Sequence, residues 1–384
     1  MRLGIVSDCV HFTAPDGRIG TETHILLQQL EALSLYYDKV VLCCPFTDYQ
    51  STFVASYYSI LHLTVIPLPN VGGDTLKDKW QLFKTIPAWW KAFKKLDQQT
   101  DIVYQRFPNN LNIPGFFYFW LKRKKVFATY TGTWSSYRNE PITYALQRWL
   151  LSKLFRGPVW VYTDQAISDP SIHPGFSPSY KQVVWAEEAP QVELRLERLR
   201  NERLSSLRMI TVGALVPNKN QQLILEACLE LKKRNIAFNL TIVGGGILKD
   251  AYQQFIDTNG LGQNILLVGK KTADELRILY REHDLVVQAP LKEGFGKVPI
   301  EGFFHGLIPV LSDLPIARMM VQGGKRGFIF NGGDVLALVE TLTEVIHYHG
   351  LAGIIENGRN YARTQTLEAW AGSYVQTVGK FYHI

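Results

Sequence analysis

The sequence predicts an α/β fold of two Rossmann-like domains, each built around a parallel sheet. With 384 residues, the chain is too long for one ordinary core and fits two domains of the usual size. Hydrophobic residues make up 46% and charged residues 20%, which is typical of a globular protein and excludes a disordered one. Short β-type runs alternate with longer helical patterns in both halves, as expected when crossover helices connect parallel strands.

Hydrophobic periodicity predicts the elements of the first half. A strand over residues 3–7 opens the chain, and a loop over residues 11–20 follows, punctuated by Pro15, Gly17 and Gly20. Apolar residues at helical spacing then predict a helix over residues 21–33. The further strands expected in this half are residues 40–44, 63–66, 102–105, 126–129 and 159–162.

The composition changes between residues 165 and 205, and we expect the domain boundary there. Prolines punctuate an irregular stretch, and the very polar run of residues 193–208 precedes a new strand. The prediction is a first domain over residues 1–190, a second over residues 191–365, and a C-terminal helix within residues 366–384.

The second half alternates more regularly between strands and helices. The expected strands are residues 209–212, 240–243, 265–268, 285–288 and 308–311. The expected helices are residues 220–234, 249–259, 272–282 and 298–305, with a last one over residues 368–381. The two halves therefore look like two copies of one architecture.

Several features favour a cytoplasmic protein. The four cysteines have no zinc-ligand spacing, which is typical of reduced thiols. The apolar run at the N-terminus ends at Asp8, as in a first strand rather than a signal peptide. The most apolar block, residues 113–121, is far shorter than the roughly 20 residues that a membrane-spanning helix needs.

The formal charge of +7 is concentrated in one stretch of the first half. Residues 76–125 contain 11 Lys and Arg against 3 Asp and Glu, interleaved with aromatic residues such as Trp89, Trp90 and Phe93. One interpretation is a patch that docks on the anionic inner face of a membrane, near a lipid-linked acceptor. The alternative is ordinary amphipathic packing with a solvated lysine face.

Three turns of the second half lie where a parallel sheet binds its ligand, beyond the carboxyl ends of strands. They are Gly213 to Lys219, the glycines 244–246, and Glu293 to Gly296, which leads into a helix containing Glu301. Glycine-rich turns at helix N-termini expose backbone N–H groups and suit a diphosphate. Lys219 would add a positive charge, and Glu293 and Glu301 would accept hydrogen bonds from sugar hydroxyls.

The segment 293–310, EGFGKVPIEGFFHGLIPV, resembles the E-x7-E signature of glycosyltransferase family 4, the large retaining GT-B family. The order and spacing of the three turns are also similar. The resemblance implies a GT-B fold, in which two Rossmann-like domains face a central cleft and the C-terminal helix crosses back to the first domain. It implies a retaining, hexosyltransferase-type transfer from a nucleotide sugar to a saccharide or lipid-linked acceptor, in polysaccharide or glycoconjugate biosynthesis.

The resemblance also implies roles for individual residues. Glu293 and Lys219 are the expected catalytic pair, the first binding hydroxyls of the donor sugar and the second neutralising the leaving phosphate. Glu301 would hold the ribose. The donor-binding positions are Gly20, Gly213, Gly244, Gly246, Phe295, Gly296 and Glu301. On the acceptor side, Tyr130 and Thr131 stand where the family often has a histidine.

The expected partners are a UDP-, GDP- or ADP-sugar as co-substrate and the acceptor. No other cofactor and no metal are expected, because the chain contains no Asp-x-Asp motif. Basic patches with aromatic residues also occur in nucleic-acid-binding proteins, but the donor motif does not require one, and no nucleic acid is expected.

One departure from the family pattern leaves an alternative open. Ala214 stands where the family usually has an arginine that clamps the phosphates, and Lys297 and Arg318 are the candidate replacements. The chain is therefore either an active glycosyltransferase or a non-catalytic, glycosyltransferase-like partner subunit. A third alternative is a GT-B enzyme of another reaction type, such as a phosphorylase or sugar-nucleotide epimerase, although no phosphate or cofactor signal favours it.

Overall fold

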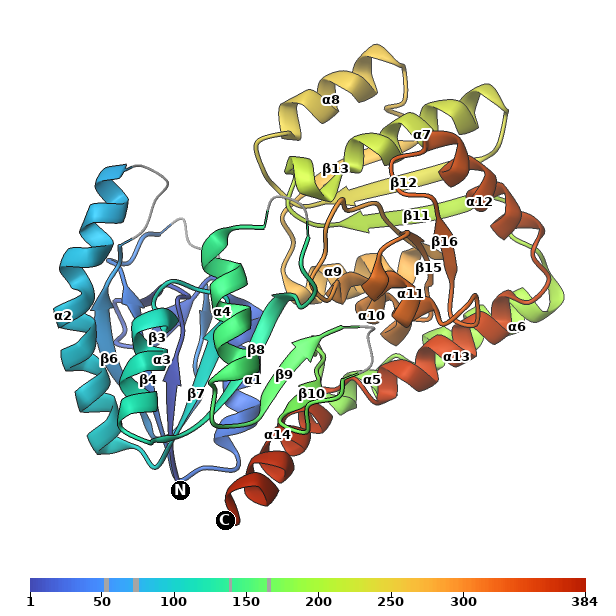
Figure 1. The fold of residues 1–384 in the computed structure, drawn as a ribbon. Coiled ribbons are helices and arrows are strands. Elements are labelled where there is room, and N and C mark those ends of the chain that lie inside the picture. Colours follow the sequence, from blue (N-terminus) through green and yellow to red (C-terminus); the bar gives the residue numbers. More distant parts are fainter. Residues whose placement is uncertain (52–54, 72–75, 138–139, 164–166) are drawn as a thin grey trace. The chain divides into compact units, whose positions relative to one another are not determined.

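The chain forms two compact units (Figure 1). The computed structural model describes residues 1–51, 55–71, 76–137, 140–163 and 167–384, with the side chains of residues 76–83 left out. The first unit consists of Met1–Pro178 and Leu367–Ile384, and the second of Ser179–Thr366. The boundary therefore lies earlier than the position expected after residue 190, because the segment that begins at Ser179 makes its contacts within the second unit.

A parallel sheet forms the centre of the first unit. Its strands are β1 (Arg2–Val6), β4 (Lys39–Phe46), β6 (Leu63–Pro69), β7 (Ile102–Phe107), β8 (Lys125–Thr133), β9 (Val159–Tyr162) and β10 (Ile172–Pro174). They lie in the order β6-β4-β1-β7-β8-β9-β10, and every neighbouring pair is parallel. The order reverses between β1 and β7, as in a doubly wound Rossmann sheet.

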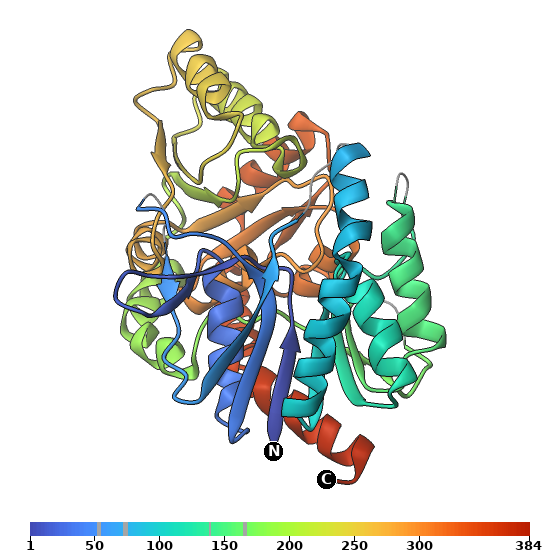
Figure 2. The same cartoon turned by 90° about the vertical axis from the view of Figure 1, so that its left-hand side faces the viewer.

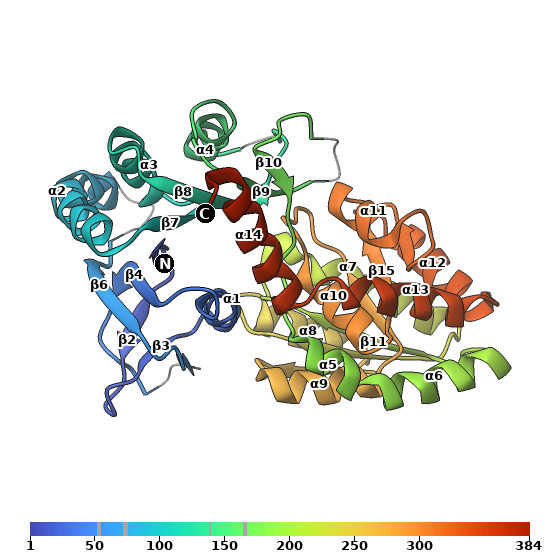
Figure 3. The same cartoon turned by 90° about the horizontal axis from the view of Figure 1, so that it is seen from below.

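Helices cover both faces of this sheet. They are α1 (His24–Ser34), α2 (Leu76–Gln99), α3 (Asn112–Leu121), α4 (Ile142–Lys153) and α14 (Leu367–Tyr382). Figure 3 shows α1 and α14 on one face and α2 and α3 on the other, and the two apolar clusters of the core divide in the same way. The long helix α2 runs beside the strands in Figure 2. Along β4, alternate side chains enter opposite clusters, as the pleat requires.

The loop expected over residues 11–20 contains a small hairpin instead. Strands β2 (His11–Thr13) and β3 (Ile19–Thr21) pair antiparallel, and β3 also pairs with β5 (Ser56–Tyr57). Helix α1 consequently begins at His24 rather than residue 21. A Cβ atom on Gly20 would lie 2.8 Å from the Phe12 ring, so this glycine lets the aromatic side chain pack against the backbone.

The second unit has the same kind of sheet. Its strands are β11 (Leu207–Val212), β12 (Phe238–Val243), β13 (Ile265–Gly269), β14 (Leu285–Gln288), β15 (Ile308–Ser312) and β16 (Phe328–Phe330). They lie in the order β13-β12-β11-β14-β15-β16, so the chain leaves the central strand β11 in one direction and returns beside it as β14. This reversal creates a switch point between β11 and β14.

Helices flank this second sheet as well. They are α5 (Gln182–Glu187), α6 (Ala189–Asn201), α7 (Gln221–Lys233), α8 (Lys249–Thr258), α9 (Ala273–Glu282), α10 (Lys297–Phe304), α11 (Pro315–Val321), α12 (Val335–His347) and α13 (Leu351–Arg363), with a short 3-10 helix at Pro217–Lys219. Helices α7, α8 and α12 pack on one face and α9 and α10 on the other. No helix among the described residues is long and apolar enough to cross a membrane.

The polar run at residues 193–208, for which the sequence predicted no element, is mostly helix α6. Its Arg195 is buried and donates to the backbone carbonyls of Arg281 at 2.9 Å and His283 at 2.6 Å. Arg195 also forms an ion pair with Asp284 at 3.4 Å, and the Asp284 carboxylate accepts a hydrogen bond from Arg208 at 2.7 Å. Arginine side chains thus bind α6 to the start of β14, which hydrophobic periodicity does not reveal.

The first testable prediction concerns Arg195. Replacing it with methionine keeps the apolar stem but leaves buried carbonyls without their donor and removes one of the arginines that pair with Asp284, so we expect a loss of about 2–4 kcal/mol of stability. The free energy of unfolding in urea measures this. The control is Arg200→Met on the same helix, whose pairs with Glu193 and Glu356 are about half exposed, and its expected cost is below about 1 kcal/mol. Equal effects of the two substitutions would contradict the assigned role.

The second prediction concerns acid stability. Burial by itself would raise the pKa of Asp284, but the hydrogen bond from Arg208 and the charges of Arg195 and Arg198 lower it overall. A lowered folded-state pKa contributes stability above the unfolded value of about 4 and loses it as the pH falls through the folded value. Asp284→Asn should therefore be less stable near neutral pH and should lose less stability on acidification. If the free energy of unfolding depended on pH in the same way for both proteins, ionisation of Asp284 would not contribute to stability.

Candidate functional site

The candidate site lies at the switch point of the second sheet, beyond the carboxyl ends of β11 and β14. The turn after β11 covers residues 213–220, and the turn after β14 covers residues 289–296. Two hydrogen bonds tie the turns together. The backbone N–H of Leu291 donates to the carbonyl of Asn218 at 2.8 Å, and the side-chain amide of Asn218 donates to the carbonyl of Lys292 at 3.0 Å. The turns therefore hold their functional side chains at fixed relative positions.

The two predicted catalytic residues form an ion pair in this site. The Lys219 ammonium donates to one carboxylate oxygen of Glu293, and the other oxygen accepts from the backbone N–H of Gly294 at 3.2 Å. Their side chains are 27% and 21% exposed, so solvent and ligands reach both. The structure thus brings together a cation suited to a phosphate and a carboxylate suited to sugar hydroxyls.

The glycine turn after β12 packs directly on the turn after β11. A Cβ atom on Gly244 would lie 1.9 Å from the carbonyl oxygen of Gly213, and one on Gly246 would lie 2.4 Å from that of Leu215. Leu215 also donates to the carbonyl of Gly245 at 2.9 Å. Gly244 and Gly246 therefore have a structural reason to be glycine, because only they permit this backbone-to-backbone contact.

The start of α10 supplies the anion-binding backbone expected after Glu293. Gly296 is the residue before the helix and has a φ of 73°, which is strained for other residues. The Phe295 side chain is buried and anchors the turn, so only its backbone is suited to a ligand. Helix N-termini of this kind attract anions through their N–H groups and dipole.

Glu301 lies on α10 and is largely buried. One carboxylate oxygen accepts from the Ser179 hydroxyl at 2.6 Å and the other from the Tyr280 hydroxyl at 2.8 Å. Sequence reasoning missed both donors. Ser179 lies in the proline-punctuated stretch and Tyr280 on the apolar side of α9, so neither carried a recognisable signal.

Buried charges surround the Glu301 region. Glu188 is completely buried and receives Arg277 at 2.6 Å and Arg281 at 2.7 Å. Burial alone would raise the pKa of Glu188, but these contacts and the neighbouring His305 lower it overall. Burial lowers the pKa of His305, whose ring stacks on Tyr280 with centroids 5.1 Å apart. This cluster fixes the side chain that holds Glu301.

Two observations bear on the missing arginine at Ala214. The carbonyl of Ala214 accepts from the Gln221 amide at 3.1 Å, which fixes the turn. Arg318 makes a two-pronged pair with Asp313 at 2.5 and 2.7 Å, so this candidate replacement is already engaged.

Among the described residues, no group of three or more His, Cys, Asp or Glu side chains is arranged to hold a metal ion.

The predicted residues of the first unit have mainly internal contacts. Tyr130 is fully buried, its ring packs against Trp134 with centroids 5.3 Å apart, and burial raises its pKa well above the usual range. The Thr131 hydroxyl donates to the carbonyl of Phe107 at 3.0 Å. Both follow the expected strand, but their side chains are occupied in the core or in a backbone contact.

Comparison with known proteins places this site in a family. Residues 198–361 match the family model described as glycosyl transferases group 1. An uncharacterized glycosyltransferase from Methanocaldococcus jannaschii is 28% identical over 158 residues, which cover 41% of this chain and 43% of that protein. A GDP-mannose-dependent alpha-(1-6)-phosphatidylinositol monomannoside mannosyltransferase from Mycolicibacterium smegmatis is 27% identical over 146 residues. These cover 36% of this chain and 38% of that protein. The match thus spans less than half the length of both relatives.

Similarity of fold extends over the whole chain. The crystal structure of Anabaena HepE in complex with UDP and glucose aligns with a TM-score of 0.69 at 16% identity, covering 99% of each chain. This likeness concerns the fold alone. Residues 198–361, which contain the candidate site, thus match the glycosyl transferases group 1 family, and the fold of the chain is GT-B.

Proposed function

We propose that this chain is a retaining glycosyltransferase that moves a sugar from a nucleotide sugar to a saccharide or lipid-linked acceptor, in polysaccharide or glycoconjugate biosynthesis. The observation that carries the proposal is the Lys219–Glu293 pair at the switch point of the second sheet. The names of the M. smegmatis relative and of the HepE complex support a nucleotide-sugar donor, because they include GDP-mannose and UDP respectively.

In this proposal, the ion pair is the resting state of the donor site. An incoming diphosphate competes with Glu293 for Lys219, and the N-terminus of α10 adds N–H groups that favour the same anion. When Lys219 turns to the diphosphate, the Glu293 carboxylate becomes available to hydroxyls of the donor sugar. Donor binding therefore exchanges an internal pair for two contacts with the substrate.

The transfer step uses these groups without a metal. The bond between the anomeric carbon and the diphosphate oxygen breaks, and its electron pair stays on the diphosphate. Lys219 and the backbone amides stabilise this growing negative charge in place. The acceptor oxygen bonds to the anomeric carbon on the same face, and its proton passes to a diphosphate oxygen. Attack on the same face retains the anomeric configuration.

Glu301 accepts the ribose hydroxyls in this scheme. Each of its oxygens already accepts one bond, from Ser179 or Tyr280, but a carboxylate oxygen has a second lone pair for a ligand. The two hydroxyl donors therefore orient the carboxylate, and they keep its ligand-facing lone pairs at fixed positions.

A second candidate function is that of a non-catalytic partner subunit. Ala214 favours it, because an arginine side chain is absent from the turn that carries Lys219. In that case the site would bind a nucleotide without turning over its sugar.

We further propose that the first unit docks peripherally on an anionic, cytoplasmic membrane surface through residues 76–125. The structure changes the expected patch. Trp89 and Phe93 are buried in the core, so they are packing residues rather than interfacial ones, whereas Trp90 is 39% exposed. The lysines at 84, 91, 94 and 95 are exposed on the same helix. The side chains of residues 76–83 lie outside the described residues.

The third prediction tests the donor site. Calorimetric titration should show binding of at least one of UDP, GDP and ADP, and radiolabelled sugar nucleotides should show hydrolysis or transfer. Lys219→Ala should weaken nucleotide binding and lower kcat by about 100- to 1,000-fold, the effect of removing one donor to a developing oxyanion. Glu293→Gln should lower turnover without weakening nucleotide binding, because it releases Lys219 from its partner.

The matched control is Lys233→Ala, an exposed lysine on α7 of the same unit, which should change neither quantity. Absence of binding to all three nucleotides would overturn the donor proposal. Binding without any turnover of their sugars would instead support the partner subunit.

The fourth prediction tests membrane docking by vesicle flotation. Binding should increase with phosphatidylglycerol content and decrease with salt. Replacing Lys91, Lys94 and Lys95 with glutamine should weaken it by roughly 100-fold, since each lysine near an anionic surface contributes about 1 kcal/mol. The control replaces the same number of lysines in the second unit, at 233, 249 and 271. An equal loss in both triple variants would contradict a patch on α2.

A further inference from the structure

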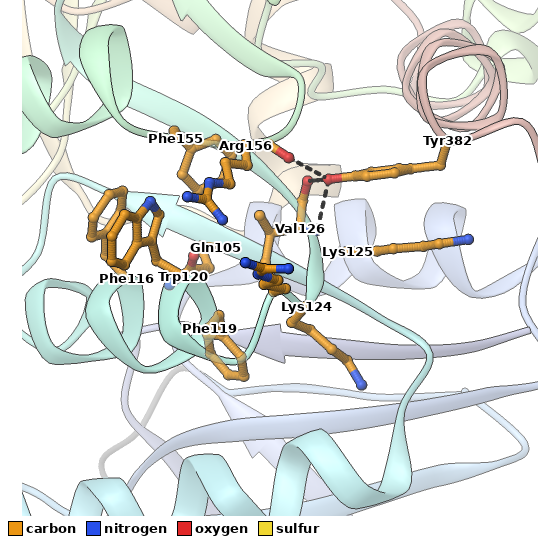
Figure 4. A pocket seen from close by; sticks show the side chains of 11 residues that line it. Gln105, Phe116, Phe119, Trp120, Lys124, Lys125, Val126, Phe155, Arg156 and Tyr382 are labelled. Atoms are coloured by element: carbon orange, nitrogen blue, oxygen red, sulfur yellow. Dashed lines mark hydrogen bonds between the residues drawn. The ribbon is translucent and has the colours of Figure 1, made fainter.

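A separate pocket lies in the first unit, at the amino end of β8 (Figure 4). It has a volume of about 130 Å³ and is bounded by α3, by the starts of β8 and the segment after α4, and by Tyr382 of α14. Tyr130 and Thr131 lie in the carboxyl half of the same strand. The pocket is therefore at the strand end opposite to the one where a parallel sheet carries its ordinary ligand site.

The interior of the pocket is aromatic. Phe116, Phe119 and Trp120 come from α3, and Phe155 follows α4. A cavity of about 150 Å³ lined by apolar side chains is large enough to hold benzene. At about 130 Å³ the pocket is slightly smaller than that, so an apolar body in it can be no larger than one six-membered ring.

A buried amide gives the pocket a polar point of recognition. Gln105 of β7 lines it and is completely buried. Its Nε2 donates to Asn112 at 3.3 Å, but its Oε1 has no hydrogen-bond partner among the residues that the structure describes. A buried acceptor without a donor destabilises the folded state. A ligand with a hydroxyl or N–H group would supply the missing donor.

The wall and rim of the pocket are strongly basic. Arg123, Lys124, Lys125 and Arg156 all line it. Lys124 is engaged by Asp97 at 2.9 Å, and the Arg156 guanidinium lies 4.7 Å from the centre of the Trp120 ring. Within the described residues, Arg123 has no carboxylate partner. The excess of positive charge favours an anionic group at this rim.

Tyr382 closes one side of the pocket. Its hydroxyl accepts from the backbone N–H of Val126 at 2.9 Å and lies 2.7 and 2.8 Å from the carbonyl oxygens of Val126 and Arg156 (Figure 4). This contact fixes α14 to the strand and to the segment after α4. The pocket is thus formed by segments that the chain holds in place without a ligand.

We propose that this pocket binds a free, amphiphilic small-molecule anion, with a ring-sized apolar body, a hydrogen-bond donor for Gln105 and an acidic group for Arg123. The hydrogen-bond donor of the ligand enters first and reaches Gln105. The ring then lies among the aromatic side chains, and the acidic group remains at the basic rim. Nothing in this proposal depends on the function proposed for the second unit.

The fifth prediction tests the pocket with 4-hydroxyphenylacetate as the probe. Isothermal titration should show binding, and a saturating concentration should raise the Tm, because a ligand of the native state stabilises it by mass action. Phenylacetate lacks the donor and 2-(4-hydroxyphenyl)ethanol lacks the charge, so each should bind about tenfold more weakly, as expected for one lost polar contact. Binding of none of the three compounds would overturn the proposal.

Two variants locate the binding. Gln105→Met removes the amide oxygen, and Arg123→Asn removes the charge while suiting the positive φ of 52° at this position. Each substitution should weaken binding of the probe about tenfold. Lys122→Asn is the matched control, since Lys122 adjoins Arg123 but does not line the pocket. Arg123 is at the surface, so that variant tests the proposal even if Gln105→Met does not fold.

Nucleotide binding separates this site from the donor site. Arg123→Asn should leave the affinity for UDP, GDP and ADP unchanged. Equal binding of the probe to wild type and Arg123→Asn would overturn the assignment. The assignment would also be overturned if the protein bound phosphatidylglycerol vesicles but not the free anion.

Discussion

The backbone contact between the turn after β11 and the glycine turn after β12 is the constraint on which the donor site depends. Two glycine Cα atoms press against carbonyl oxygens of the neighbouring turn, and backbone hydrogen bonds fix the contact. The same turn is bonded through Asn218 to the segment that carries Glu293. Lys219 is thereby held between two rigid partners, and its pairing with Glu293 follows from the backbone rather than from the side chains alone.

Much of the architecture was predictable because local sequence determines it. Strands β9 and β14 have the expected bounds, and the alternation of strands and helices correctly predicted two parallel sheets. The predicted positions of Glu293 in a turn and of Glu301 in the following helix are confirmed, because their spacing follows from one turn and one helix. These features depend on residues that are close in the sequence, where periodicity and turn chemistry are informative.

Features that depend on distant residues were not predictable in this way. The β2–β3 hairpin requires pairing with β5, and the buried face of α6 includes Arg195, which binds backbone carbonyls, among its apolar residues. Trp89 and Phe93 could not be assigned to the core or to the surface from their spacing to lysines. Ser179 reaches Glu301 across more than 100 residues of sequence. Each of these contacts is a tertiary one, set by packing rather than by a local pattern.

The position of α14 has a consequence for the order in which the protein forms during translation. Trp370 and Tyr374 belong to the core of the first unit, and the Tyr374 ring stacks on Trp160 at 3.7 Å. These residues leave the ribosome only after all of the second unit, which is continuous from Ser179 to Thr366. Domains usually fold as they emerge, with the N-terminal one first. In this chain, the second unit is complete as a polypeptide while the first still lacks part of its core. The earliest-synthesised unit is therefore the last whose core is complete.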